Sequence, residues 1–261
     1  MTKRHDIIWL ESVDSTNKEA IRHISELDNL SVLSAFCQSE GRGCANNRWQ
    51  SDSGKNLTFS IVLKFSDKFM EMDKSLPPMN AYDQFVISEA AALSVIDLLA
   101  EYDVCAKVKW PNDIYVDKRK ICGILIENSL KGSSITHSVV GVGLNVNQSS
   151  FDESIPGPTS LLIETGNEYD IRLMLERYVE ILEEYLRRYC QPRGGYARLR
   201  KLYLSQMWRK DEYAEFVDLR VEPGERFTGM IKGLTDLGNL VMKTEKGELQ
   251  EFSFKEISYI I

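Results

Sequence analysis

Hydrophobic and polar positions in the first part of the chain alternate between short β-type runs and two helical runs. Runs rich in β-branched and aromatic residues predict strands at 7–10, 31–38, 57–63, 106–110, 114–116, 121–126 and 137–147. Apolar residues at helical spacing predict a helix over 17–27. A second helix is expected over 80–102, where acidic residues interrupt the longest apolar stretch and favour a buried helix over a membrane span. This pattern indicates an α+β body.

The pattern changes near Lys210. Before it, an amphipathic helix is expected over 170–188 and a shorter one over 196–207, after a loop over 148–159. Beyond it, short strands are expected at 214–221, 226–234, 240–243, 249–252 and 256–261, separated by turn residues such as Gly238 and Gly247. We therefore predict two domains, 1–209 and 210–261, the second a small barrel or sandwich with its own core.

Composition narrows the class of protein. The 261 residues are 43% hydrophobic and 27% charged, as in ordinary soluble globular proteins. A net charge of -7 argues against general binding to DNA or to anionic membranes. The five cysteines form no Cys-x-x-Cys pair, and the polar N-terminus is followed by no apolar run, so neither a disulfide framework, a zinc site nor a signal peptide is indicated. We expect a cytoplasmic protein.

Candidate chemistry is densest between Lys109 and Glu127. Two β-rich runs flank the turn at 117–119, which predicts a hairpin. Pro111 cannot donate to a sheet, so Asn112 and Asp113 are expected at a strand mouth, with Lys120 on the paired strand. For a lone Lys-Asp pair, a solvated hairpin with its charges facing water would be the favoured explanation, but the residues around this pair favour a ligand site.

Three other segments suit ligand binding, and each has a structural alternative. Ser15 and Thr16 stand at a strand-to-helix turn, where Thr16 and Glu19 fit a capping box. The loop 39–49 contains two glycines around Arg42 and suits an anion, but it could be a plain surface loop. Gly141 and Gly143 lie within one strand, where either a ligand or tight packing would require missing side chains.

In this order, the motifs resemble those of biotin protein ligases. The blocks are Asp14-Ser15-Thr16-Asn17, Gln38 with Gly41-Arg42-Gly43 and Trp49, Lys109-Trp110-Pro111-Asn112-Asp113, Lys120-Ile121-Cys122-Gly123-Ile124-Leu125, and Gly141-Val142-Gly143-Leu144-Asn145. The resemblance implies a mixed sheet with helices on one side, similar to class II synthetases, and an SH3-like C-terminal domain. It also implies a two-step reaction, in which biotin and ATP form biotinyl-5′-AMP and pyrophosphate, and biotin then passes to one lysine of a biotin carboxyl carrier protein domain.

The resemblance assigns roles to individual residues. Arg42 and Lys120 would be the catalytic cations near the carboxylate and α-phosphate, which stabilise developing negative charge. Asp113 would hold Mg²⁺, for which oxygen ligands are suited. Ser15, Thr16 and Gln38 would bind the ureido ring of biotin, Asn112 and Asn145 the adenylate, and Trp49 would pack near the adenine. The remaining expected ligand-binding positions are Asn17, Gly41, Gly43, Lys109, Gly123, Gly141 and Gly143.

Two departures from the family pattern affect the expectations. The chain enters the catalytic body within its first ten residues, so we expect neither a helix-turn-helix domain nor DNA binding, while a homodimer remains possible. The loop has Cys44, Ala45, Asn46 and Asn47 where a common family pattern has two arginines, a glycine and an arginine. A lipoate or octanoate ligase of the same fold and a biotin-sensing protein without catalysis are the alternatives. Retention of Asp113 and Lys120 argues against the latter.

Overall fold

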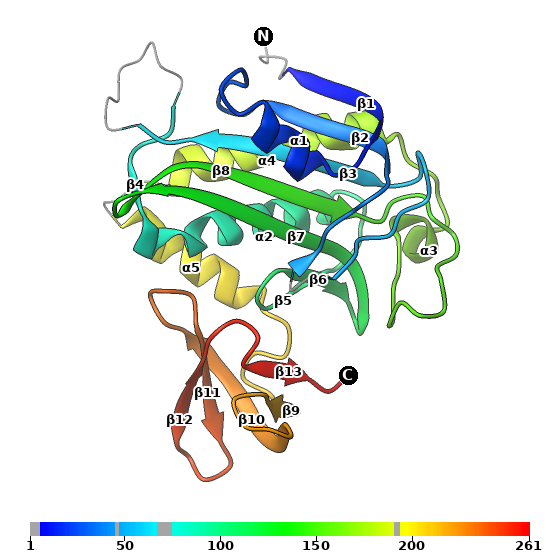
Figure 1. The fold of residues 1–261 in the computed structure, drawn as a ribbon. Coiled ribbons are helices and arrows are strands. Elements are labelled where there is room, and N and C mark those ends of the chain that lie inside the picture. Colours follow the sequence, from blue (N-terminus) through cyan, green and yellow to red (C-terminus); the bar gives the residue numbers. More distant parts are fainter. Residues whose placement is uncertain (1–5, 45–46, 67–74, 191–193) are drawn as a thin grey trace.

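A mixed sheet forms the centre of the larger part of the molecule (Figure 1). The computed structural model describes residues 6–44, 47–66, 75–190 and 194–261. Seven strands are hydrogen-bonded in the order β1-β2-β3-β8-β7-β6-β5, β4 pairs with β8, and only β1 and β2 among these described strands are parallel. The bounds are β1 Ile7–Val13, β2 Val32–Gln38, β3 Leu57–Lys64, β4 Met79–Asn80, β5 Lys107–Lys109, β6 Asp113–Val116, β7 Arg119–Lys131 and β8 Ser134–Leu144. The α+β class is confirmed.

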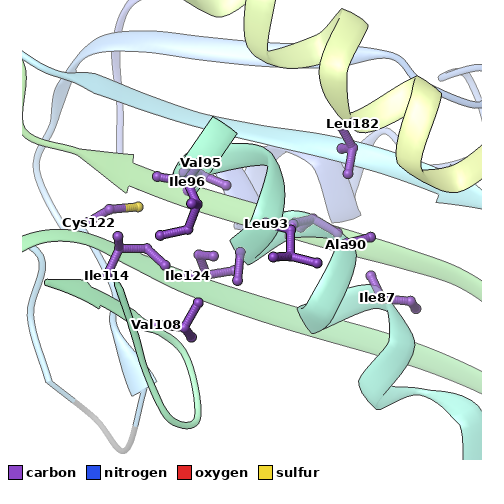
Figure 2. Packing of buried hydrophobic residues seen from close by; sticks show 14 of the residues in the cluster. Ile87, Ala90, Leu93, Val95, Ile96, Val108, Ile114, Cys122, Ile124 and Leu182 are labelled. Carbon is purple, nitrogen blue, oxygen red and sulfur yellow. The ribbon is translucent and has the colours of Figure 1, made fainter. Parts of the chain in front are cut away.

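Helices cover both faces of this sheet, whereas the resemblance implied one. Helices α2 (Phe85–Ala100), α4 (Ile171–Tyr189) and α5 (Gly195–Ser205) lie behind it in Figure 1, and α1 (Thr16–Arg22) lies in front. Figure 2 shows α2 side chains such as Leu93 near the strand residues Ile114 and Ile124. On the other face Ala20 of α1 packs in a separate small cluster with Leu33, Val62 and Val139. Strand alternation explains the division, because neighbouring residues point to opposite faces.

The last five strands form a second, antiparallel sheet below the first in Figure 1. Their order is β12-β11-β10-β9-β13, and we call this part the barrel. Its bounds are β9 Tyr213–Asp218, β10 Glu225–Leu234, β11 Leu240–Thr244, β12 Leu249–Phe252 and β13 Ile257–Tyr259. Barrel residues such as Phe216 and Phe252 belong to the same buried hydrophobic cluster as α2 and α4. The buried residues of the barrel are therefore continuous with those of the body, and the separate small core stays a prediction.

Local structure differs from the sequence prediction at several element ends. Ser15, and not Thr16, is the N-cap of α1, and no side chain caps this helix, so the capping box is not formed. Helix α1 ends at Arg22, and a 3₁₀ turn at Ala81–Asp83 precedes α2. Strand β8 ends at Leu144, and a short helix α3 (Leu161–Thr165), which periodicity is too weak to reveal, follows the expected loop. Within the described ranges, no helix is long and apolar enough to cross a membrane.

Candidate functional site

Cross-strand pairing places the main candidate residues in one row on the α1 face of the sheet. Lys109 of β5 pairs with Asp113 of β6, Asp113 with Gly123 of β7, and Gly123 with Gly143 of β8. Directly paired residues point to the same face, so two charged side chains stand beside two positions that have none. Gly141 lies on the same face, two residues before Gly143 in β8. The Lys109–Asp113 motif and the Gly141–Gly143 motif, which are remote in sequence, thus share one surface of the sheet.

A cavity of about 120 Å³ opens on this surface. The predicted residues that line it are Ser15, Thr16, Asn17, Gln38, Arg42, Gly43, Trp49, Asn112, Asp113, Lys120, Gly123, Gly141 and Gly143. Most of the residues that the sequence predicted for the site therefore line one cavity. The positions come from the start of α1, from β2, β6, β7 and β8, and from the loops after β2 and β5, which explains why no single motif defined the site.

The indole of Trp49 lies against both paired glycines, and at Gly143 it leaves no room for a side chain. A Cβ atom on Gly143 would lie 2.3 Å from Trp49 Cε2, and one on Gly123 would lie 3.2 Å from Trp49 Cζ3. Trp49 Nε1 is buried without a hydrogen-bond partner among the described residues. The glycines therefore form a flat floor, which an aromatic ring covers in this structure.

Hydrogen bonds connect the first candidate residues in a buried chain. Gln38 Oε1 accepts from the Thr16 backbone N–H at 2.8 Å and lies 3.3 Å from Thr16 Oγ1. Ser60 Oγ lies 2.7 Å from Thr16 Oγ1 and 2.6 Å from Asn17 Oδ1. Ser60, Thr16 and Asn17 are all at least 96% buried. These hydroxyls and amides are therefore fixed before a ligand binds.

The chain continues to Arg42 through a glutamate. Asn17 Nδ2 donates to Glu127 Oε2 at 2.8 Å and to the Leu125 carbonyl at 3.2 Å. Arg42 donates to Glu127 Oε1 at 3.0 Å. Gly141 makes room for Asn17, since a Cβ atom there would lie 2.2 Å from Asn17 Oδ1. Glu127 therefore joins the polar chain to the loop after β2.

Asp113 and Lys120 form an ion pair at the other end of the cavity. Lys120 Nζ lies 2.6 Å from Asp113 Oδ1, and both side chains are partly exposed. Asn112 is fixed beside them because its Nδ2 donates to the Ile124 carbonyl at 2.8 Å. The solvated alternative for this hairpin is not supported, because the pair lines a cavity.

A Mg²⁺ ion fits this end only if a ligand supplies most of its coordination. Among the described residues no three His, Cys, Asp or Glu side chains gather in a metal-binding cluster. One carboxylate, Asp113, faces the cavity near Lys120. A single carboxylate together with substrate phosphates is a common protein environment for Mg²⁺. The donor set is thus compatible with a metal that arrives with a nucleotide.

Three predicted residues do not line the cavity. Lys109 Nζ lies 3.3 Å from Tyr115 Oη and stands over the rings of Tyr115 and Tyr259. Asn145 lies just beyond β8, where its Nδ2 donates to the Thr159 carbonyl and its Oδ1 is buried without a partner among the described residues. Gly41 lies against Trp49, whose carbonyl oxygen would be 2.3 Å from a Cβ atom there.

The loop after β2 folds back as a small hairpin. The Gly43 N–H donates to the Asn47 carbonyl at 2.7 Å, the Trp49 N–H donates to the Gly41 carbonyl at 3.0 Å, and Arg42 pairs with Arg48. Ala45 and Asn46, which replace family residues in this loop, lie outside the described residues. Cys44, Asn47 and Arg48 line the cavity. A surface loop without function would not be expected to form a cavity wall.

Sequence reasoning missed two residues of the polar chain, Ser60 and Glu127. Both stand in strands whose alternation suggested only sheet pairing. Ser60 had one available signal, because it is a small polar residue in the middle of a largely apolar strand. Glu127 had another, since it follows directly on the apolar run 121–126. Buried polar residues in such runs require partners.

Comparisons with known proteins agree with this geometry. Residues 9–145 match the model of the Biotin/lipoate A/B protein ligase family, and residues 217–258 match that of the Biotin protein ligase C terminal domain. The first match contains every predicted site residue, and the second lies within the barrel.

Similar proteins cover nearly the whole chain. It is 26% identical over 91% of its length to biotin--[acetyl-CoA-carboxylase] ligase of Paracoccus denitrificans, of which it covers 94%. It is 28% identical over 94% of its length to biotin--protein ligase 1, chloroplastic, of Arabidopsis thaliana, and spans 64% of that relative's length. The structure of the Aquifex aeolicus biotin protein ligase in complex with biotin and ATP superposes with a TM-score of 0.75 at 27% identity, covering 97% of both chains. Because one family model matches more than half of its residues, the chain belongs to the biotin/lipoate A/B protein ligase family.

Proposed function

We propose that this chain is an ATP-dependent biotin protein ligase. It activates biotin to biotinyl-5′-AMP with release of pyrophosphate, and then transfers biotin to one lysine of a biotin carboxyl carrier protein domain. The main observation is the polar chain from Gln38 to Arg42, which is buried in its middle and borders the same cavity as the glycine floor and the Asp113–Lys120 pair. The similarity to ligases of this name over nearly the full chain supports the proposal.

The hydrogen-bond donors and acceptors of the polar chain indicate which of its groups are available to a ligand. Asn17 Nδ2 donates to two oxygen acceptors, so Asn17 Oδ1 must accept the proton of Ser60. Ser60 Oγ also lies 2.7 Å from Thr16 Oγ1, and the Thr16 hydroxyl can donate to Gln38 Oε1 at 3.3 Å. Thr16 Oγ1 is left as an acceptor for a ligand N–H group, while the Ser15 hydroxyl and Gln38 Nε2 can donate to a ligand carbonyl. A ureido ring has both kinds of group.

The first step joins two anions. A carboxylate oxygen of biotin attacks the α-phosphorus of ATP, and the bond to pyrophosphate breaks. Arg42 and Lys120 supply the positive charge that reduces repulsion and stabilises the developing phosphorane. A bound Mg²⁺, held by Asp113, would neutralise phosphate charge and favour departure of pyrophosphate. Asn112, Asn145 and Trp49 are proposed to contact the adenylate.

The second step needs no covalent bond to the enzyme. The carrier lysine, as the free amine, attacks the acyl carbonyl carbon, AMP leaves with the bonding electrons, and the amine loses a proton. Lys120 again faces a developing negative charge. The part of the chain from 1 to 209 would bind biotin and ATP, and 210–261 would form the smaller C-terminal domain, consistent with its separate sheet.

A transfer assay tests the proposal against its alternatives. The purified protein is incubated with a biotin carboxyl carrier protein domain, ATP and Mg²⁺, with either biotin or lipoate, and the carrier is examined by mass spectrometry. We expect a stable biotinyl addition that requires ATP. Lipoate lacks the ureido N–H and carbonyl groups, and each buried polar group left unpaired costs about 1–3 kcal/mol. Transfer of lipoate alone, or biotin binding without transfer, would replace the proposal by one of the alternatives.

A further inference from the structure

The barrel contacts two consecutive residues of the Lys109–Asp113 segment, one on each face of the sheet. Tyr259 of β13 packs on Lys109, with the Lys109 ammonium 5.0 Å from the ring centroid. Trp110 is buried on the opposite face, where its Nε1 donates to the Gly238 carbonyl at 2.9 Å and its ring packs 5.3 Å from that of Phe254. The segment that leads to Asn112 and Asp113 is thus fixed from the barrel side.

The environment of Lys109 is aromatic. Its ammonium lies between the rings of Tyr115 and Tyr259, 4.8 Å and 5.0 Å from their centroids. Trp208 packs against both rings, at 5.5 Å and 5.8 Å. No carboxylate in the described part of the chain lies within 4.0 Å of the ammonium. The rings orient the cation by the attraction of their electron-rich faces without neutralising its charge.

The remaining contacts point to a role for this charge. Lys109 pairs directly with Asp113, which stands at the cavity, so the two side chains rise from the same face of the hairpin. The two aromatic rings beside the Lys109 ammonium take the place of water, so its charged form has lost part of its hydration. A phosphate group that bound near Asp113 together with its metal ion would stabilise the charged form of Lys109 again.

We propose that Tyr259 is a positioning residue that orients Lys109 toward the phosphates of the bound nucleotide. The inference rests on the proposed function, because it assumes that ATP binds beside Asp113. On this inference the barrel contributes Tyr259 as the second aromatic ring beside Lys109, because among the described residues the body provides only Tyr115 on the other side. Arg209 stabilises this wall by donating to the Ile260 carbonyl at 2.8 Å.

Steady-state kinetics of pyrophosphate release with biotin and ATP test the inference. Tyr259→Met keeps an apolar side chain of similar size but removes the ring, so the KM for ATP should rise about three- to thirtyfold, while kcat and biotin affinity change less than about twofold. Tyr259→Phe should behave as the parent, because the Tyr259 hydroxyl has no partner among the described residues. The matched control is Phe227→Leu, which disturbs ring packing with Phe216 and Phe252 away from Lys109.

A double-mutant cycle separates positioning from general stabilisation. Lys109→Met should raise the KM for ATP at least as much as Tyr259→Met, and the double variant should be no worse than Lys109→Met alone. Additive effects, or an equal rise in Phe227→Leu, would overturn the inference. If Tyr259→Met does not fold, Lys109→Met alone still tests the inference. An unchanged KM for ATP in this variant would show that Lys109 does not contact the nucleotide and would overturn the inference. A parent protein that releases no pyrophosphate with biotin would instead contradict the proposed function.

Discussion

Lys120 is the residue with the most specific proposed role. It meets Asp113 at 2.6 Å across the β6–β7 hairpin, and it also approaches the floor, since a Cβ atom on Gly123 would lie 3.2 Å from its ammonium. A cation in this place can contact both the carboxylate and the α-phosphate of a ligand lying on the floor. Its charge would therefore act in both proposed steps.

Lys120→Ala should slow adenylate formation and transfer by about ten- to a thousandfold, because a fixed charge that stabilises the transition state is lost. Biotin affinity should change much less, since the polar chain from Gln38 to Glu127 stays intact. Single-turnover kinetics and calorimetry measure the two effects. Lys118→Ala, in the exposed turn of the same hairpin, is the control and should act as the parent. A loss of biotin affinity in proportion to rate would contradict the assigned role.

Ser60 is the central link of the polar chain, and its removal should affect both stability and binding. Ser60→Ala leaves the buried Asn17 Oδ1 without its donor, so the free energy of unfolding should fall by about 1–3 kcal/mol. Thr16 also loses its hydrogen bond with Ser60, and biotin affinity should fall with it. Urea unfolding and calorimetry give both values. In the control Ser34→Ala, a single weak bond of 3.5 Å to the Thr58 carbonyl is lost. Equal effects of the two substitutions would show that the chain has no special role.

At the scale of elements, the loop after β2 is connected to the sheet by an ion pair. Arg42 reaches Glu127 of β7 and Arg48 pairs with Arg42 through the backbone. Both arginines line the cavity. Loop 41–49 thus lacks three arginines of the family pattern and has two cations, of which Arg42 is already paired with a carboxylate.

Arg42→Ala should increase the release of free biotinyl-adenylate and the labelling of unrelated lysines, because a reactive mixed anhydride must be kept from water until the carrier arrives. Single turnover with radiolabelled ATP and filter retention measures the released fraction. Cys44→Ser alters the same loop without changing its charge, and it should retain the adenylate. If Arg42→Ala retained the adenylate equally well, closure of the site would have to come from outside this loop.

At the scale of the whole molecule, hydrogen bonds and one hydrophobic cluster join the barrel to the body. Glu89 of α2 is fully buried and pairs with Arg200 of α5, which donates to the Thr235 carbonyl of the barrel at 2.5 Å. One oxygen of Glu89 has no partner among the described residues. Burial raises the pKa of Glu89 from 4.5 to about 7, although Arg200 opposes this shift.

A raised pKa means that the folded protein binds more protons than the unfolded chain between about pH 4.5 and 7. The contribution of Glu89 to stability should therefore be largest below pH 4.5 and fall as the pH rises through 7, by up to about 3 kcal/mol. Glu89→Gln should remove this pH dependence, whereas Glu176→Gln on the exposed face of α4 should not. Urea unfolding from pH 5 to 8 provides the comparison. Parallel pH profiles for the parent and Glu89→Gln would contradict the assignment.

The sequence by itself determined the elements and most of the cavity wall. Period-two and helical patterns are local, and they placed nearly all strands and long helices. The five motifs named residues that later met on one face, because missing side chains at Gly123 and Gly143 and charges after Pro111 are visible in the sequence. Even the alternating strands indicated which residues would share a surface.

Only the tertiary structure decided which partners these residues contact. The sequence placed Thr16 in a capping box, yet its hydroxyl bonds instead with Ser60, which is distant in the chain. Lys109 was expected at the ligand and is enclosed by aromatic rings, one of them from the barrel. The barrel was expected to have its own core, and its buried residues are continuous with those of the body. Such contacts depend on the free energy of burial and on pairing between remote segments, and local patterns contain no information on which remote segments meet.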